Sequence, residues 1–203
     1  MFSQCGFHCL RATAETLSDV IATLEKAQHN GEAGYFILLD IKAAFDSLPF
    51  PNILKAVRDL GVTGLFFAYT AAFLGGRIMR VCVGRVLSAS RVATVGVPPG
   101  SVLSPFLFNL ALAGIDDHIP RALSSDVRIA VNVEDIAVLA TGPVPSGRRA
   151  RTNVQTVLDS IDTGITGSRI RLSPAKTEAM LHHPSYGAQS NTPRFTLQTI
   201  PVP

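Results

Sequence analysis

Three acidic residues, Asp40, Glu134 and Asp135, interrupt apolar runs in this chain of 203 residues. Asp40 follows YFILL, whose length and composition favour a buried β-strand. Glu134 and Asp135 separate VRIAVNV from IAVLA, two short runs that predict a hairpin. An ionised carboxylate among apolar side chains is costly unless hydrogen bonds or a cation compensate it. Either these acids are polar turn and strand-end residues, or a positive group belongs beside them.

The two alternatives imply different chemistry. An isolated Asp40 is most simply a helix cap or a turn residue. If its strand and the hairpin are neighbours in one sheet, the three carboxylates converge, and like charges that close require a cation. Oxygen ligands select a hard ion such as Mg²⁺, for which Mn²⁺ is a possible substitute. A pair of such ions would suit phosphoryl or nucleotidyl transfer, because together they bind the attacking and the leaving oxygen.

The elements that must position these acids follow an α+β pattern with an antiparallel sheet. Leu17, Val20, Ile21 and Leu24 share one face of the first predicted helix, with a period near 3.6. The expected elements are, in chain order, a helix at 13–26, a strand at 35–41, helices at 51–60 and 64–74, a hairpin at 77–95, a loop at 96–101, a helix at 102–115, a hairpin at 127–140, a helix at 153–165 and two short strands within 169–181. The helix at 64–74 is apolar throughout, so we expect it to be buried.

Composition narrows the class of protein. Hydrophobic residues make up 47% of the chain and charged residues only 16%, which predicts faces that a partner, a ligand or a further domain covers. A net charge of +3 permits a polyanionic partner without requiring one. Three cysteines (Cys5, Cys9 and Cys82) do not form a disulfide framework, and CGFHC lacks the second pair that a zinc site needs. The apolar run at 64–74 is too short to span a bilayer, so no membrane is implied.

Five segments resemble one family in order and spacing. FILLDIKAAFDSLP resembles the first catalytic motif of reverse transcriptases of non-LTR (LINE-like) retrotransposons. GVPPGSVLSPFLFNL resembles the second motif, NVEDIAVLA occupies the place of the aromatic-x-Asp-Asp box, and LSPAKTEAML is similar to the motif that carries a lysine. QCGFHCLRATAETL resembles the segment that precedes the first motif. One such match would be weak evidence, whereas the ordered set is specific.

The resemblance implies a fold and a reaction. The fold would be a polymerase palm, an antiparallel sheet of ferredoxin-like or RRM-like type packed on helices, with a partial fringe of fingers. The reaction would be RNA-directed DNA synthesis, in which a DNA primer on an RNA template attacks a dNTP. Asp40, Glu134 and Asp135 would be catalytic and hold two Mg²⁺ ions.

The family also assigns roles outside the acids. The Ile41 carbonyl would lie near the ions, and Phe45 would exclude a 2′-hydroxyl from the nucleotide site. Lys176 would supply charge or a proton to the departing pyrophosphate, although a solvated strand-end lysine is an equal alternative. The remaining positions expected to contact dNTP or template are Pro99, Gly100, Ser101 and Asn109.

Three residues depart from the family pattern. Asn132 stands where an aromatic residue is usual, Glu134 where the first aspartate is usual, and Pro99 where glutamine is usual. Glutamate extends the carboxylate by about 1.5 Å, the length of one further bond. Catalytic geometry tolerates only about 0.5 Å. These changes indicate a degenerate copy, so a catalytically dead remnant with weak nucleic-acid binding remains an alternative, as does an unrelated α+β interaction domain.

The resemblance divides the chain into residues 1–34, a fingers-side segment and helix, residues 35–183, the palm, and residues 184–203, a polar tail that leads towards a primer grip and thumb. By this comparison the chain starts late and stops early, and we expect further fingers, a thumb and an endonuclease in a longer polyprotein. A nuclear location is implied by the family only, because no targeting signal is seen in the sequence.

Overall fold

The computed structural model describes residues 2–4, 13–123, 126–143, 148–167, 170–182, 195–197 and 200–201. It forms two compact units. The first comprises Met1–Lys42, Gly114–Gly167 and Arg171–Pro203, and the second comprises Ala43–Ala113 and Ser168–Ile170. Cys5, Cys9 and most of the segments 4–17 and 184–203 that were singled out above lie outside the described residues.

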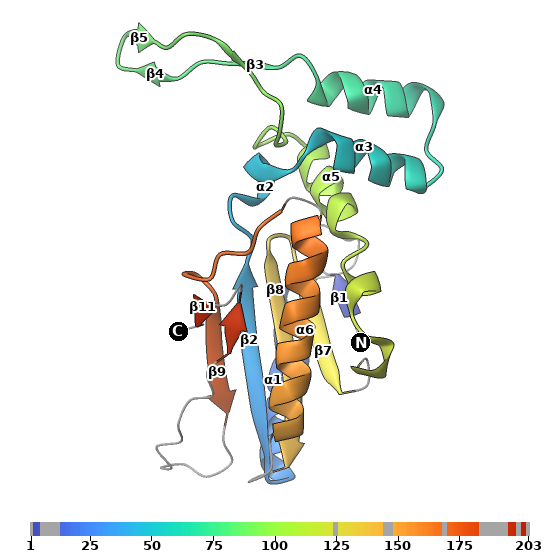
Figure 1. Ribbon diagram of the computed structural model, residues 1–203, viewed down its shortest axis with the longest axis vertical. Helices are drawn as coiled ribbons and strands as arrows, with labels where there is room; N and C mark the ends of the chain where they lie inside the picture. Colours follow the sequence, from blue (N-terminus) through green and yellow to red (C-terminus); the bar gives the residue numbers. More distant parts are fainter. Residues whose placement is uncertain are drawn as a thin grey trace. The chain divides into compact units, whose positions relative to one another are not determined.

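The first unit is built on a five-stranded sheet in the order β1-β7-β8-β2-β9 (Figure 1). Its strands are β1 (Phe2–Gln4), β2 (Glu32–Asp40), β7 (Val127–Asn132), β8 (Asp135–Pro143) and β9 (Glu178–His182). β2 pairs antiparallel with β8 and with β9, and β7 and β8 form a hairpin. The predicted α+β fold with an antiparallel sheet is therefore confirmed, and the predicted hairpin at 127–140 is one of its parts. The parallel pairing of β1 with β7 had no signal in the sequence.

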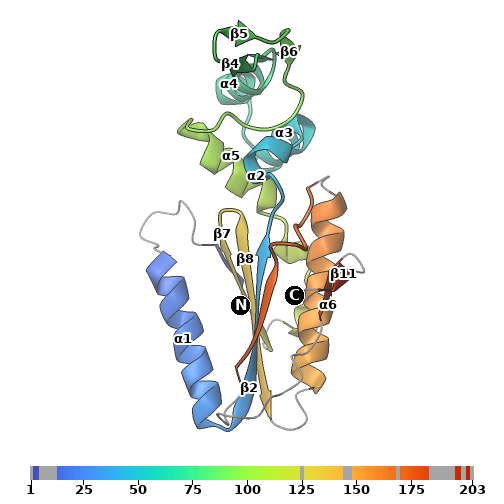
Figure 2. The ribbon, with the colours of Figure 1, turned by 90° about the vertical axis from the view of Figure 1, so that its left-hand side faces the viewer.

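The two faces of this sheet differ because side chains alternate along each strand. In β2, Ile37 and Leu39 are almost fully buried, whereas Leu38 on the opposite face is 39% exposed. Helix α6 (Arg148–Gly167) packs on the buried face, and α1 (Thr13–His29) lies along the other (Figure 2). Asp40 shares its face with Leu38, and this is the face towards α1.

Helix α6 supplies most of the core that supports the sheet. Val154, Val157, Leu158 and Ile161 recur at helical spacing and are completely buried. Each such side chain contributes roughly 1.5–3 kcal/mol on leaving water. The amphipathic helix predicted at 153–165 is thus confirmed and begins five residues earlier.

The apolar face of helix α1 is only partly covered by the sheet. Leu17 and Ile21 on its apolar face are 58% and 46% exposed. An ion pair of 2.6 Å joins Asp19 of α1 to Arg128 of β7, which attaches the helix to the sheet by charge. The apolar face is therefore partly open.

The second unit contains four helices and a long hairpin. The helices are α2 (Ala44–Ser47), α3 (Phe50–Asp59), α4 (Gly64–Leu74) and α5 (Leu103–Leu112). The hairpin is made of β3 (Ile78–Met79), β4 (Cys82–Val83), β5 (Val86–Leu87) and β6 (Arg91–Val92), as predicted for 77–95.

The expectation of a buried helix at 64–74 is wrong within the described structure. Leu65 is 88% exposed and Tyr69 58%, while Thr70 and Leu74 are buried. Helix α4 packs against α3 along one side only. Because it is apolar on all sides, packing on one side leaves the other apolar sides in water. Among the described residues, no helix is long and apolar enough to cross a membrane.

The remaining elements are short. They are the 3₁₀ turns η1 (Asp116–His118) and η2 (Arg121–Leu123), and the strands β10 (Thr196–Leu197) and β11 (Ile200–Pro201). Although the last twenty residues are polar in sequence, Phe195 and Leu197 are each only 1% exposed. Phe195 meets the edge of Tyr35 at a centroid distance of 6.1 Å. This segment thus adds to the core of the first unit.

Candidate active site

Asp40 and Asp135 lie directly opposite each other in the antiparallel register of β2 and β8. Asp40 is the last residue of β2 and Asp135 the first of β8. The predicted adjacency of the strand and the hairpin is therefore confirmed. Directly opposed residues of an antiparallel pair have β-carbons about 4.5–5.5 Å apart, a distance that one cation can bridge.

A tight turn holds Glu134 next to this pair. Asn132 pairs with Asp135, so the β7–β8 connection consists of Val133 and Glu134 alone. Val133 has φ of 58°, a left-handed conformation that is strained for a β-branched residue. The Glu134 carbonyl accepts a hydrogen bond of 3.2 Å from the Ile41 amide, which attaches the turn to the residue after Asp40.

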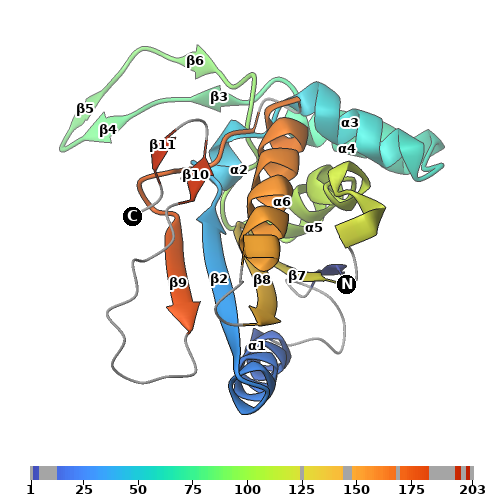
Figure 3. The ribbon, with the colours of Figure 1, turned by 60° about the horizontal axis from the view of Figure 1, so that its bottom comes forward.

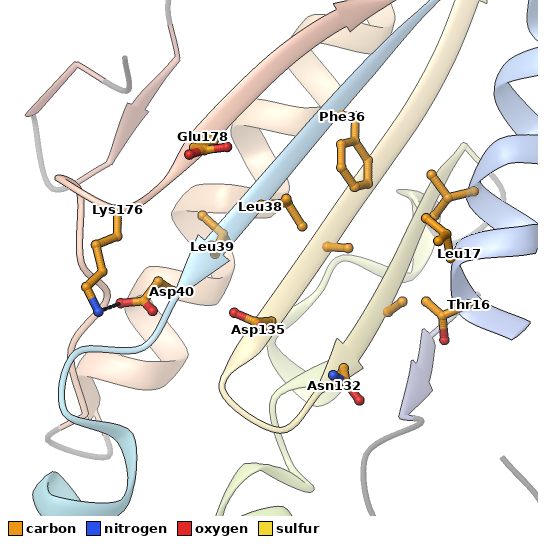
Figure 4. Close-up of a pocket in the computed structure, with 13 residues that line it drawn as sticks. Thr16, Leu17, Phe36, Leu38, Leu39, Asp40, Asn132, Asp135, Lys176 and Glu178 are labelled. Atoms are coloured by element: carbon orange, nitrogen blue, oxygen red, sulfur yellow. Dashed lines mark ion pairs between the residues drawn. The ribbon is translucent and has the colours of Figure 1, made fainter. Parts of the chain in front are cut away.

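The segment before β9 holds Asp40 from the other side. The Asp40 carbonyl accepts a hydrogen bond of 2.8 Å from the Ser173 amide, and the Ser173 carbonyl in turn accepts one of 3.1 Å from the Lys176 amide. The Lys176 Nζ lies 3.4 Å from the Asp40 Oδ2 (Figure 4). The lysine that the sequence singled out thus lies beside the first predicted acid. Its side chain is 70% exposed, so the ion pair is weak.

The surroundings of Asp135 disfavour its negative charge. Partial burial raises the pKa of Asp135 above its ordinary 3.8, and the charges of Glu134 and Asp40 raise it further, while Lys176 opposes the shift. The Asp40 Oδ2 is buried and accepts no hydrogen bond within the described structure. Among the described residues, the one charged partner of this oxygen is the exposed Lys176 ammonium at 3.4 Å, so a hard divalent cation that displaces the lysine would satisfy it better.

The three carboxylates lie close enough for the charges of Asp40 and Glu134 to act on Asp135, but in the described structure they do not form a ready metal site. Among the described residues, no group of three or more His, Cys, Asp or Glu side chains is arranged to hold a metal ion. Asp40 and Asp135 occupy opposed strand positions, whereas Glu134 belongs to the turn. The physical reason is that a two-residue turn redirects the chain, so its side chains do not follow the alternation of either strand.

A pocket of about 480 Å³ lies beside the two aspartates, between α1 and the sheet. Leu17 and Val20 of α1 and Phe36 and Leu38 of β2 form apolar walls. The polar lining comprises Thr16, Asp40, Asn132, Asp135, Lys176 and Glu178 (Figure 4). Sequence reasoning missed the α1 residues and Glu178 as pocket residues. The signal in the sequence is the apolar stripe of α1, part of which lines the pocket.

The expected nucleotide gate, Phe45, lies in the second unit. It is half-buried, and its ring packs on Phe108 with a centroid distance of 5.0 Å. Its carbonyl accepts a hydrogen bond of 2.7 Å from the Val97 amide. Gly96 has φ of +80°, and a β-carbon there would lie 2.8 Å from the Asp46 carbonyl oxygen. The glycine therefore permits close approach to Asp46, so the first and second motifs are joined through their main chains.

The other expected substrate contacts belong to the same unit. Pro99 and Gly100 are exposed, and Gly100 has φ of +81° with no atom within 4 Å of a β-carbon position. The Ser101 hydroxyl accepts a hydrogen bond of 3.2 Å from the Leu103 amide at the start of α5, and Asn109 is half-buried on that helix. By contrast, the acids and Lys176 belong to the first unit.

Residues 1–197 match the family described as reverse transcriptase (RNA-dependent DNA polymerase). The chain belongs to the reverse transcriptase family. The match covers both units and every residue predicted above to have a role. Membership also excludes the unrelated interaction domain that the sequence had left open.

Relatives of this reverse transcriptase domain come from mobile elements. It is 30% identical over 175 residues to the RNA-directed DNA polymerase from mobile element jockey of Drosophila melanogaster, an alignment that covers 85% of this chain and 19% of that protein. It is 25% identical over 191 residues to the retrovirus-related Pol polyprotein from the type-1 retrotransposable element R2 of Nasonia vitripennis. This alignment covers 90% of this chain and 18% of that protein. The predicted non-LTR retrotransposon origin is confirmed, and the chain spans about a fifth of these relatives.

Solved telomerases share the fold. The telomerase from Candida albicans in complex with a fragment of telomeric RNA superimposes with a TM-score of 0.65 at 13% identity, covering 96% of this chain and 33% of that one. Apo telomerase from Candida tropicalis, truncated at its C-terminal domain, superimposes with a TM-score of 0.64 at 13% identity. The superposition covers 96% of this chain and 38% of the telomerase chain. These likenesses support the polymerase palm as the fold.

Proposed function

We propose that this reverse transcriptase domain performs RNA-directed DNA synthesis and that Asp40 and Asp135 bind the divalent ions it needs. The observation that carries the proposal is their opposed register together with the buried Oδ2 of Asp40, which within the described structure accepts no hydrogen bond and has only the exposed Lys176 ammonium beside it. The substrates are an RNA template, a DNA primer and a dNTP. The 3′-hydroxyl of the primer releases its proton to solvent, its oxygen forms a bond to the α-phosphorus of the dNTP, the bond from that phosphorus to the bridging oxygen breaks, and pyrophosphate leaves.

Reverse transcriptases generally use divalent metal ions, and we propose Mg²⁺ here, with Mn²⁺ as an alternative. Asp40 and Asp135 are the proposed ligands, and Glu134 is a third if its longer side chain reaches them. When bound, the ions would activate the attacking oxygen and stabilise the charge that develops on the leaving group. Lys176, 3.4 Å from Asp40, balances part of the negative charge and is the proposed cation for the departing pyrophosphate.

The substrate contacts form a second part of the proposal. Phe45 is held by Phe108 and by the Val97 amide, which suits a ring that must reject a 2′-hydroxyl. The exposed loop at Pro99 and Gly100 presents main chain to nucleotide or template, with Ser101 and Asn109 behind it. We assign the Ile41 carbonyl to the ion site because its amide is already bonded to the Glu134 carbonyl.

A specific observation favours a second candidate, a catalytically dead remnant. Among the described residues, no set of three acids is arranged to hold a metal, and the acid that departs from the family, Glu134, lies in the turn. A misplacement of about 1 Å can cost on the order of a hundredfold in rate. The palm boundaries at 35–183 and a nuclear site of action stay proposals, supported by family resemblance.

Primer extension on an RNA template separates the two candidates. The native chain is compared with Asp40→Asn and with the double variant Glu134→Asp, Pro99→Gln, in Mg²⁺ and in Mn²⁺. Extension by the native chain that Asp40→Asn abolishes supports the polymerase. Activity in the double variant alone supports the remnant and assigns the defect to these two positions. Extension that survives Asp40→Asn contradicts the proposed site.

A further inference from the structure

The hairpin at residues 77–95, hereafter the arm, holds the positive excess of the chain. It contains Arg77, Arg80, Arg85 and Arg91 and no acidic residue. The whole chain has 18 basic and 15 acidic residues, so without the arm 14 basic and 15 acidic residues remain, a formal charge of −1. No aspartate or glutamate occurs between Asp59 and Asp116. The charge is therefore concentrated on one element.

The arm is an extended two-stranded ribbon (Figure 3). Ile78 pairs with Val92 near its base and Cys82 with Leu87 near its tip. A two-residue turn at the tip begins with Gly84, whose φ of 60° suits a hairpin turn. The six residues from the start of β3 to the end of β4 would extend over roughly 20 Å at about 3.3 Å per residue.

Arg77 fixes the base of the arm. Its Nη2 donates a hydrogen bond to the Gly96 carbonyl and its Nε donates one of 3.2 Å to the Leu74 carbonyl. Its guanidinium also lies over the Phe50 ring, 5.2 Å from the centroid. The Arg77 guanidinium therefore already has its partners within the second unit.

The other three arginines point to an external partner. Arg80, Arg85 and Arg91 are all exposed, and within the described structure none forms an ion pair or a side-chain hydrogen bond. A guanidinium donates paired hydrogen bonds that match phosphate oxygens. Three of them spaced along a ribbon suit a ligand that repeats its negative charge at intervals, as a nucleic-acid strand does.

We propose that the arm binds the sugar–phosphate backbone of a nucleic acid through Arg80, Arg85 and Arg91. The arm contains no aromatic residue, so it offers no surface for stacking bases, and recognition is independent of sequence. A second copy of the chain is the competing occupant, because exposed valines such as Val83 and Val86, each 73% exposed, flank the tip. Pairing of two arms would, however, bring four positive charges against four.

The test is the salt dependence of binding, measured by fluorescence anisotropy without nucleotides or divalent ions. The probes are a 20-base-pair RNA–DNA hybrid and the RNA strand alone, and the full chain is used. The triple variant Arg80→Gln, Arg85→Gln, Arg91→Gln is compared with a matched control, Lys26→Gln, Lys55→Gln, Arg148→Gln, which removes three exposed positive charges elsewhere. All six substituted positions are exposed, and the Lys55–Asp59 pair that the control removes is an exposed i,i+4 pair, so both variants should keep nearly the native melting temperature.

The arm variant should lose about 2.7 units of slope in log affinity against log salt on the hybrid, at about 0.9 per phosphate contact, and about 2.1 on the RNA strand, at about 0.7 per contact. Between 50 and 200 mM salt, these three contacts account for a roughly 40-fold change in affinity for the hybrid and roughly 20-fold for the RNA strand. The control should keep most of the native slope. An equal slope in the arm variant, or no binding by the native chain, overturns the proposal. So does a change in oligomeric state with unchanged nucleic-acid binding, which would assign the arm to a second copy.

The choice of nucleic acid as ligand rests on the proposed function, but the two can fail separately. Asp40→Asn should abolish extension and leave the salt slope unchanged. The arm variant should lower the slope whether or not the native chain extends a primer. A loss confined to one of the two probes would identify whether the arm prefers the hybrid or the single strand.

Discussion

Gly96 packs directly on the main chain of Asp46, with its missing β-carbon position only 2.8 Å from the Asp46 carbonyl oxygen. This contact joins the segment after Asp40 to the loop that carries Pro99. Gly96→Ala should destabilise the chain by roughly 3 kcal/mol or more, since it combines a left-handed φ with a clash against backbone. Chemical denaturation measures the change.

Gly100→Ala is the matched control for that variant. Gly100 has nearly the same φ, +81°, but its β-carbon position is open. Gly100→Ala should lower the free energy of unfolding by only about 1 kcal/mol, because it places a side chain at a left-handed φ without a steric clash. Equal losses in the two variants would show that the contact with Asp46 is unimportant.

Lys176→Met should separate ion binding from catalysis. The ammonium competes with divalent ions for the Asp40 Oδ2, so its removal should tighten ion binding by roughly twofold to fivefold, the range for an exposed ion pair. The maximal rate of extension should fall because the proposed cation for pyrophosphate is lost. The Mg²⁺ dependence of melting temperature and of extension rate measures the two effects, and exposed Lys26→Met serves as control. An unchanged extension rate would show that Lys176 has no catalytic role and is only a solvated strand-end residue.

Asp135 should make stability depend on pH in metal-free buffer. Its pKa is raised in the folded chain, so the folded state keeps this proton to a higher pH than the unfolded state does. The free energy of unfolding should therefore fall as pH rises from 3.8 through the raised value, and stay lower above it. Asp135→Asn should be more stable than the native chain at pH 7, and the difference should vanish below pH 3.8.

Melting temperatures between pH 3.5 and 7 with a chelator measure this difference. Asp59→Asn, which changes an exposed acid paired with Lys55, is the control and should show no such gain. A native chain that is more stable than Asp135→Asn at pH 7 would contradict the electrostatic account of the site.

Phe45→Val should relax the choice of sugar. A smaller side chain removes the clash with a 2′-hydroxyl, and a steric contact of this size is worth roughly tenfold or more in specificity. The ratio of kcat/KM for dNTP and rNTP measures the shift, in the native chain or in the double variant if only that one is active. Phe66→Leu on the exposed face of α4 should leave the ratio unchanged. An unchanged ratio in Phe45→Val would leave Phe45 as a packing residue against Phe108.

The sequence predicted the elements well where the signal was local. Alternation around Gly84 and around Glu134 predicted both hairpins, whereas the pairing that sets Asp40 opposite Asp135 was only a condition of the metal-site hypothesis. The sequence-based prediction failed where contacts with residues distant in the sequence determine which side chains are buried. Leu65 and Tyr69 suggested a buried helix because a fully apolar sequence does not reveal which of its sides is covered.

The site shows the same division. The ordered motifs identified Lys176, but its contact with Asp40 depends on the pairing of β9 with β2, which local sequence does not encode. The position of Glu134 in the turn depends on the left-handed Val133, a conformation that propensity argues against. Both features are set by tertiary structure around the acids.

Binding of Mn²⁺ measured by electron paramagnetic resonance tests the central claim most directly, because it needs neither substrate nor turnover. The native chain should bind Mn²⁺, Asp40→Asn and Asp135→Asn should each lose at least about tenfold in affinity, and Asp59→Asn should bind as the native chain does. Mn²⁺ binding that survives both substitutions, or no binding by the native chain, would contradict the assignment of Asp40 and Asp135 as the ion site.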